Sequence, residues 1–177
     1  VPSPGVGGAC LSKDPHILAY FSKHAGYEAK LIEEGRAINE KIPKLIIDRV
    51  SSTLDSMGKD LSSSKVFIVG FAFKGNPETS DLRDSTTIWL VEQLKRRCGN
   101  ISGFDPVIGA DEIRKLGINY SDLDDGFSEA DVVMLMNNHK SFCEFDISEI
   151  SRKMNTPGIV YDSWGMMRRG HVSNLQG

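Results

Sequence analysis

Residues 65–70 read Lys-Val-Phe-Ile-Val-Gly, and this stretch decides the fold. It is a short, continuous apolar run that ends at a glycine, as expected of a strand buried on both faces of a parallel sheet. The segment 86–97 follows it with apolar residues at helical spacing, which predicts an amphipathic helix. A buried strand followed by such a helix is the start of a βαβ unit, so the sequence predicts an α/β fold.

The same alternation continues along the rest of the chain. Short apolar runs at 101–104, 131–136 and 158–162 predict further strands, and the segments 111–116 and 147–154 predict helices between them. Strands separated by helices of about ten residues indicate a doubly wound, mostly parallel sheet of the Rossmann-like kind.

Before this sheet, residues 15–57 predict a helical arm. Apolar side chains recur there at helical spacing: Ile17, Leu18, Phe21, Ile38, Ile42, Leu45, Ile46, Val50, Leu54 and Met57. Pro43 either kinks one long helix or opens a second helix at its first turn. Gly58 is a helix stop followed by a small, polar stretch, so we predict two units, residues 1–58 and residues 59–177.

The composition is that of an ordinary globular protein. Of the 177 residues, 40% are hydrophobic and 25% charged, and the net charge is −3. A slightly acidic chain gives no electrostatic reason to expect a nucleic-acid partner, and no apolar run is long enough to span a membrane. Cys10, Cys98 and Cys143 form no CxxC pair. We therefore expect no disulfide framework and a reducing compartment, the cytoplasm.

A glycine-rich loop precedes the first cysteine. Residues 4–15 read Pro-Gly-Val-Gly-Gly-Ala-Cys-Leu-Ser-Lys-Asp-Pro, so that Gly5, Gly7 and Gly8 stand just before Cys10. Glycines let backbone N–H groups approach a ligand closely, and the positive end of a following helix favours a thiolate. The loop thus indicates a nucleophile beside oxyanion donors. A glycine-rich turn before a buried structural cysteine explains the same residues.

Two charged residues follow the thiol within one helical turn. Asp14 stands four residues after Cys10, where a carboxylate could position a water or hold a proton during covalent chemistry. Capping of the next helix, with Pro15 at its first position, is the simpler role for Asp14. Lys13 either raises the thiolate fraction of Cys10 or points to solvent.

The first predicted strand leads into a long polar loop, residues 70–85. Ligands of open α/β sheets bind at the carboxyl ends of strands, which is where this loop begins. Its spacing of glycines matches neither a GxGxxG fingerprint nor a P-loop. Lys74 and Arg83 are the cations best placed for a phosphate or diphosphate. Ion pairs of Arg83 with Asp81 or Asp84 are the alternative.

Two other strands end in segments with polar residues. His139 follows the strand at 131–136, and a structural role is favoured over ligand binding there. Arg168 and Arg169 come soon after the last strand. The spacing of the remaining histidines suggests no metal site.

Three motifs in order resemble the UDP-glucose/GDP-mannose dehydrogenase family. The loop at 5–14 resembles that family's catalytic-cysteine loop, and Phe-Ala-Phe-Lys at 71–74 with Arg-Asp-Ser at 83–85 resembles its nucleotide-sugar signature. Asn-Glu at 39–40, followed by Pro43, resembles the helix that leads into the C-terminal domain.

The resemblance implies an NAD-dependent enzyme that oxidises the C6 alcohol of a nucleotide sugar twice, to the uronic acid. Cys10 would attack the intermediate aldehyde, and Asp14 would help to position the water that hydrolyses the resulting thioester. The glycine loop (Gly5, Gly7 and Gly8) would hold the sugar. The resemblance further assigns Phe73, Lys74 and Arg83 to the substrate and Lys13 to the cofactor. It places residues 1–58 in a central region used for dimerisation and residues 59–177 in a UDP-binding domain.

Some family features are missing from the sequence. The family has an N-terminal Rossmann domain with the NAD fingerprint and an upstream segment with a catalytic Lys and Asn, and neither is present here. We therefore expect a C-terminal portion that is inactive alone. Many relatives have Arg two residues after the aspartate of the last strand, where this chain has Trp164.

The resemblance leaves the sugar open. Val6 and Asp14-Pro15 resemble the branch acting on UDP-N-acetylmannosamine or UDP-N-acetylglucosamine, whereas Lys13-Asp14 resembles the UDP-glucose branch. Ala9 stands where the former has His and the latter Ser. Two other functions are a non-catalytic nucleotide-sugar-binding module that dimerises through its arm, and a dimerisation unit without a ligand.

Overall fold

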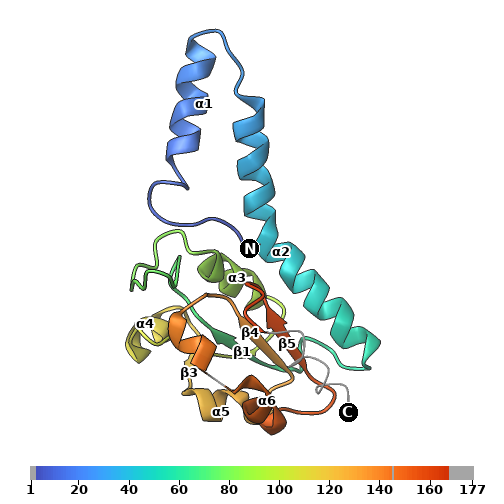
Figure 1. Cartoon of the computed structure of the whole chain (residues 1–177). Helices are drawn as coiled ribbons and strands as arrows, with labels where there is room; N and C mark the ends of the chain where they lie inside the picture. The colour runs from blue at the N-terminus through green and yellow to red at the C-terminus, as the bar shows by residue number, and fades with distance from the viewer. Residues whose placement is uncertain (1–2, 145, 168–177) are drawn as a thin grey trace.

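The computed structural model describes residues 3–144 and 146–167, and its centre is a five-stranded sheet (Figure 1). The strands are β1 (Lys65–Val69), β2 (Asn100–Phe104), β3 (Asn119–Tyr120), β4 (Val132–Leu135) and β5 (Ile159–Asp162). They lie in the order β3-β2-β1-β4-β5, and every pairing is parallel. The predicted Rossmann-like sheet is confirmed. The sequence does not predict β3, because two residues are too few to show a period.

Helices connect the strands. They are α3 (Thr86–Leu94), α4 (Ala110–Lys115), α5 (Leu123–Phe127) and α6 (Ile147–Ile150), with 3₁₀ turns at Lys140–Glu144 and Ser151–Lys153. The side chain of Ser85 accepts a hydrogen bond from the N–H of Thr87 and so caps α3. The predicted helix at 147–154 is one α turn followed by a 3₁₀ turn.

Two antiparallel helices, α1 (Asp14–His24) and α2 (Lys30–Ser56), form an arm that stands out from the sheet (Figure 1). The chain turns between them at Gly26, which has φ of +81°. Pro43 lies inside α2, so of the two alternatives, the one in which it opens a second helix is excluded. Gly58 has φ of +73° just after α2, which confirms it as the helix stop.

The apolar face predicted for the arm is confirmed only in the second half of α2. Ile46, Ile47, Val50 and Leu54 are buried there, and α2 packs against α3. Ile38 and Leu45 are exposed by 60% and 62%, which contradicts the prediction. The reason is that the sheet and α3 cover only part of the helix.

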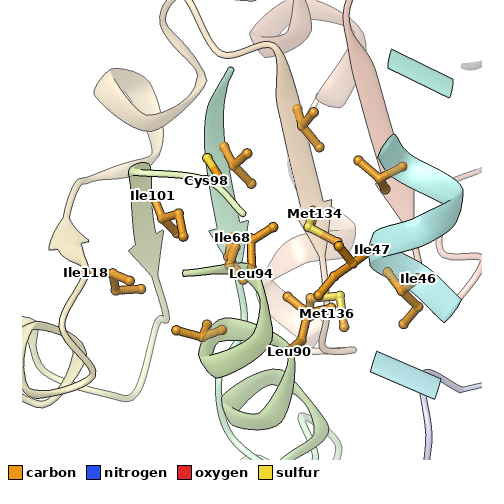
Figure 2. Packing of buried hydrophobic residues seen from close by; sticks show 14 of the residues in the cluster. Ile46, Ile47, Ile68, Leu90, Leu94, Cys98, Ile101, Ile118, Met134 and Met136 are labelled. Carbon is orange, nitrogen blue, oxygen red and sulfur yellow. The ribbon is translucent and has the colours of Figure 1, made fainter. Parts of the chain in front are cut away.

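The sheet has a hydrophobic core on each of its two faces. Along β1, Val66 and Ile68 pack on the face covered by α2 and α3, whereas Phe67 and Val69 pack on the face covered by α5. Figure 2 shows Ile47 of α2 reaching the first of these cores, beside residues of β4 and α3. Alternation along a strand explains why its sequence is apolar at every position.

The strand order has a topological switch point. β1 pairs with β2 on one side and with β4 on the other, so the chain leaves the carboxyl ends of β1 and β4 in opposite directions. The segments 70–85 and 136–142 begin there. Among the described residues, no helix has the length and hydrophobicity needed to cross a membrane.

Candidate functional site

The glycine-rich loop lies between α2 and the segment that leads into α3. On the α2 side, Asn39 holds Val6 by two hydrogen bonds: Oδ1 accepts from the N–H at 2.7 Å and Nδ2 donates to the carbonyl at 2.9 Å. Arg36 donates to the carbonyl of Leu11 at 3.3 Å. Both α2 side chains are buried. The arm therefore holds the loop at Val6, among its glycines, and at Leu11, just after Cys10.

On its other side the loop rests on residues 83–86. The N–H of Gly8 donates to the carbonyl of Arg83 at 3.2 Å. The hydroxyl of Ser12 donates to Oδ2 of Asp84 at 2.6 Å. These contacts join two segments that lie more than 70 residues apart in the sequence. The cysteine loop is thus packed against the polar loop after β1.

The close packing explains the glycines of the loop. A Cβ on Gly7 would lie 2.3 Å from the carbonyl oxygen of Asp84. A Cβ on Gly8, which has φ of +94°, would lie 3.0 Å from the ring of Phe73. Gly5 lies against Asn39 and Thr86. The groups that approach these glycines closely therefore come from the protein itself, mainly from the polar loop after β1 and the start of α3.

Cys10 is an exposed free thiol at the end of this loop. The N–H of Asp14 donates to the carbonyl of Cys10 at 2.8 Å, so the two residues stand one helical turn apart. The carboxylate of Asp14 pairs with Lys13 at 2.7 Å and raises the pKa of that lysine. Asp14 is the first residue of α1 and makes no capping bond, so the prediction that it caps the helix is wrong.

The polar loop after β1 contains two cations: Lys74 has no carboxylate partner among the described residues, and Arg83 has one. Nζ of Lys74 lies 5.3 Å from the centroid of the Phe73 ring, and no carboxylate among the described residues pairs with it. The guanidinium of Arg83 donates hydrogen bonds to both carboxylate oxygens of Asp81, with N···O distances of 2.6 to 3.1 Å. Hydrogen bonds from Arg83 lower the pKa of Asp81 to about 2. The ion pair considered for Arg83 in the sequence is therefore present with Asp81.

The segments after β1 and β4 are joined at the switch point. Nδ2 of Asn137 donates to the carbonyl of Ala72 at 2.8 Å. The N–H of Gly75 donates to Oδ1 of Asn138 at 3.0 Å. The contacts are tight, because a Cβ on Gly75 would lie 2.4 Å from the backbone nitrogen of His139.

Asp105 lies directly after β2, at the carboxyl-terminal edge of the sheet, and accepts several hydrogen bonds there. Its carboxylate accepts hydrogen bonds from four backbone N–H groups, of Phe71 (2.6 Å), Ala72 (3.3 Å), Val107 (2.9 Å) and Ile108 (3.2 Å). Burial acts to raise its pKa, but His139 and these N–H groups outweigh burial and lower it. In the sequence, an acidic residue directly after the apolar run 101–104 is the signal that could have found Asp105.

His139 is fully buried and faces carboxylates on both sides. Its Nδ1 lies 3.3 Å from Oε1 of Glu78, and its Nε2 lies 3.5 Å from Oδ2 of Asp105. Burial acts to lower the pKa of His139, but the two carboxylates outweigh burial and raise it. The structural role favoured for this histidine agrees with its burial.

The sheet edge does not fit a dinucleotide cofactor. A Cβ on Gly70 would lie 2.4 Å from Cβ of Asn137, so this glycine makes room for protein rather than for a pyrophosphate. In dinucleotide-binding folds an acidic residue at the end of a strand binds a ribose hydroxyl. Here the carboxylate of Asp105 is occupied by four backbone N–H groups. Lys13 is paired with Asp14, and its assignment to a cofactor stays a prediction.

Comparison with protein families agrees with this geometry. The model described as the UDP binding domain of the UDP-glucose/GDP-mannose dehydrogenase family matches residues 67–169, more than half of the chain. The chain belongs to this family. The model for the family's central domain matches residues 1–41, which include the cysteine loop. The predicted resemblance is confirmed.

Relatives of this family member include enzymes named for different sugars. A UDP-N-acetyl-D-mannosamine dehydrogenase of Methanococcus vannielii is 30% identical over 162 residues, which are 90% of this chain and 35% of the relative. A UDP-glucose 6-dehydrogenase of Rhizobium meliloti is 29% identical over 173 residues, which are 96% of this chain and 38% of the relative. The chain thus spans little more than a third of the length of these relatives.

Solved structures show the same arrangement. A UDP-D-ManNAc dehydrogenase from Pyrococcus horikoshii superposes with a TM-score of 0.81 at 25% identity, over 96% of this chain and 37% of that one. The UDP-N-acetyl-mannosamine dehydrogenase Cap5O from Staphylococcus aureus superposes with a TM-score of 0.69 at 26% identity, over 94% of this chain and 35% of that one. Arm and sheet together therefore follow the family's fold.

The remaining residues singled out in the sequence lie apart from the thiol or outside the described part. Nε1 of Trp164 donates to the carbonyl of Met136 at 3.1 Å. Arg168 and Arg169 lie outside the described residues. Cys98 is a buried free thiol, and burial raises its pKa. Within the described ranges, no three His, Cys, Asp or Glu side chains are grouped to hold a metal ion.

Proposed function

We propose that this family member is the thiol-bearing and nucleotide-sugar-binding portion of an NAD-dependent UDP-sugar 6-dehydrogenase. The observation that carries the proposal is the docking of the Cys10 loop on the polar loop after β1, through the contacts of Gly8 and Ser12. A thiol and a cation for the diphosphate then belong to one site. The matched residues make up only 35% and 38% of these two relatives, so we expect the 177-residue chain alone to be inactive.

Cys10 would be the nucleophile of this reaction. Its thiolate would attack the C6 aldehyde of the half-oxidised sugar, and the exposed side chain leaves the sulfur accessible to that carbon. Asp14, one helical turn away, would position the water that hydrolyses the thioester. NAD is the hydride acceptor of this reaction class, and we assign no step through it to the described residues.

Binding of the substrate would fall to both loops. Gly5, Gly7 and Gly8 would hold the sugar with backbone groups, Phe73 would contact the substrate, and Lys74 would face the diphosphate as the unpaired cation. Arg83 would contribute after rearrangement of its pair with Asp81. We favour a UDP-N-acetylhexosamine, with UDP-glucose as the alternative, since relatives bear both names.

The arm would join two copies of the chain. Large apolar side chains are exposed along α1 and α2, among them Phe21 at 65% and Leu31 at 87%. Surfaces of this kind are typical of interfaces between proteins. We therefore propose a homodimer or a higher homo-oligomer that forms through the helical region.

Alkylation of the 177-residue chain tests the role of Cys10. We expect an alkylating reagent to modify Cys10 faster than the buried Cys98, and UDP-N-acetylmannosamine to slow the reaction at Cys10. Peptide mass spectrometry measures both rates. UDP-glucose, in a parallel experiment, ranks the sugars. If saturating UDP-sugar binds without changing the rate at Cys10, the thiol lies away from the sugar and a non-catalytic binding module is the better description.

A further inference from the structure

The segment 71–79 carries Phe73 and Lys74, and polar contacts hold both of its ends. At its start, the N–H groups of Phe71 and Ala72 donate to the carboxylate of Asp105. At its far end, Glu78 meets Nδ1 of His139 at 3.3 Å. The imidazole stands between these two anchors, because its Nε2 lies 3.5 Å from Asp105. One ring therefore connects the segment after β1 with those after β2 and β4.

The geometry selects the charged form of this ring. A neutral imidazole has one N–H and one lone pair, so it would turn the lone pair towards one of two carboxylates. Only the imidazolium can donate from both nitrogens. His139 has no exposed surface, and Phe142 closes one side of it with an edge-on ring contact at 5.1 Å between centroids. Nε2 lies 3.5 Å from Oδ2 of Asp105 without a hydrogen bond of good geometry, so a positive charge on the ring is what would attract this carboxylate.

We propose that His139 is a positioning residue, which as an imidazolium between Asp105 and Glu78 holds the segment 71–79 in the conformation that presents Phe73 and Lys74 to a nucleotide sugar. This inference rests on the proposed function only for the identity of the ligand. The clamp itself is a property of the described residues. Loss of one proton leaves a neutral ring that can donate to only one of the two carboxylates, so the charge attraction to Glu78 is lost and the hold on the far end of the segment weakens.

The clamp formed by His139 should depend on pH. The titratable groups that face the ring are Asp105, after β2, and Glu78, after β1, and the third neighbour, Phe142, does not titrate. Because the folded protein raises the pKa of His139 above its ordinary value of 6.5, the clamp is complete below that value. It is lost as the pH rises through the folded-state pKa.

Glu78→Gln is the variant that tests the clamp. The side chain of Glu78 is half exposed, so the fold should tolerate the change. Glu112→Gln is the matched control, because Glu112 is a half-exposed glutamate paired with Lys115 on α4. The readout is the dissociation constant of UDP, measured by calorimetry with the 177-residue chain at several pH values. UDP has a phosphate pKa of about 6, so the variant is compared with wild type at each pH and that titration cancels.

We expect Glu78→Gln to bind UDP about tenfold more weakly at slightly acidic pH. The difference should shrink at alkaline pH, where wild type has also lost the positive charge of the ring. Glu112→Gln should match wild type throughout. A ratio of dissociation constants that is the same at every pH, or no difference at any pH, overturns the proposal.

A second measurement separates the clamp from the proposed function. In the ligand-free chain, ¹⁵N NMR of the histidine rings, assigned with His139→Gln, should give His139 a pKa above 6.5 that falls in Glu78→Gln. A His139 that titrates at or below 6.5 overturns the clamp, whatever UDP does. If the pKa of His139 behaves as expected but UDP binds at no pH, the clamp stands and the proposed function is wrong.

Discussion

Lys74 is the cation that the site leaves without a carboxylate partner among the described residues. We expect Lys74→Ala to weaken UDP binding by about 1.5–3 kcal/mol, or roughly 10- to 150-fold, which is the range for a hydrogen bond to a charged group. Calorimetry with the 177-residue chain measures the change. Lys30→Ala is the control, because that lysine lies at the start of α2 and pairs with Glu28. Unchanged affinity in Lys74→Ala would place the diphosphate elsewhere.

Asp81 gives a prediction at acid pH. Hydrogen bonds from Arg83 lower its pKa from 3.8 to about 2. The ion pair therefore stabilises the fold fully above 3.8, and its contribution is lost as the pH falls towards about 2. We expect Arg83→Gln to return the pKa of Asp81 towards 3.8, as followed by the ¹³C shift of the carboxyl group. Arg114→Gln, which removes a partner of Asp111 on α4, should leave Asp81 unchanged.

Residues differ in how far the sequence predicts them. The strands β1 and β4 follow directly from apolar runs that only a buried strand explains. On α2, by contrast, Ile38 is exposed and the neighbouring Asn39 is buried. Hydrophobic periodicity assigns the two residues the other way round, because it has no means of recognising a polar side chain that is buried to hold a loop. Such local conflicts are expected at functional sites.

The contact between the buried Asp105 and His139 was also not predicted from the sequence. Each was visible as a polar residue after a strand, and parallel topology places both at one edge. Their pairing depends on the switch point, which brings the ends of β1, β2 and β4 together. It could not be predicted, because the sequence pattern of a single segment does not determine the order of the strands. The resemblance to a family supplied roles for Cys10 and Lys74, but not these supporting contacts.

At the scale of elements, α2 serves both the sheet and the cysteine loop. Its second half packs in the core, while Asn39 in its first half holds Val6. Asn39→Ala removes two hydrogen bonds and leaves partly buried backbone groups unpaired. We expect the free energy of unfolding to fall by about 1–3 kcal/mol and the amide of Val6 to exchange faster with solvent. Chemical denaturation and hydrogen exchange measure the two effects.

Asn100→Ala is the control for this change. Asn100 is an exposed asparagine at the start of β2, far from the loop in sequence, and its loss should have little effect on either measurement. The decisive comparison is the amide of Val6. If its exchange is as slow in Asn39→Ala as in wild type, Asn39 does not hold the loop, even where the global stability has fallen.

At the scale of the whole molecule, apolar surface is concentrated on the arm. Among the described residues, every exposed large hydrophobic side chain except Val107 lies between Val6 and Met57. The sheet, by contrast, buries its apolar residues in two cores. A surface with this asymmetry is stable in water when a second copy covers it, and a two-fold pairing of arms would bury the same face on both copies.

We therefore expect the 177-residue chain to self-associate through its arm. Phe21→Glu with Leu31→Glu introduces charges at two exposed arm positions and should shift the chain towards monomer, because burying unpaired charges in an interface costs several kcal/mol. Sedimentation velocity measures the mass, and circular dichroism checks that the helices persist. Val107→Glu, outside the arm, should leave the association unchanged. A wild-type chain that is monomeric at all concentrations would contradict this prediction.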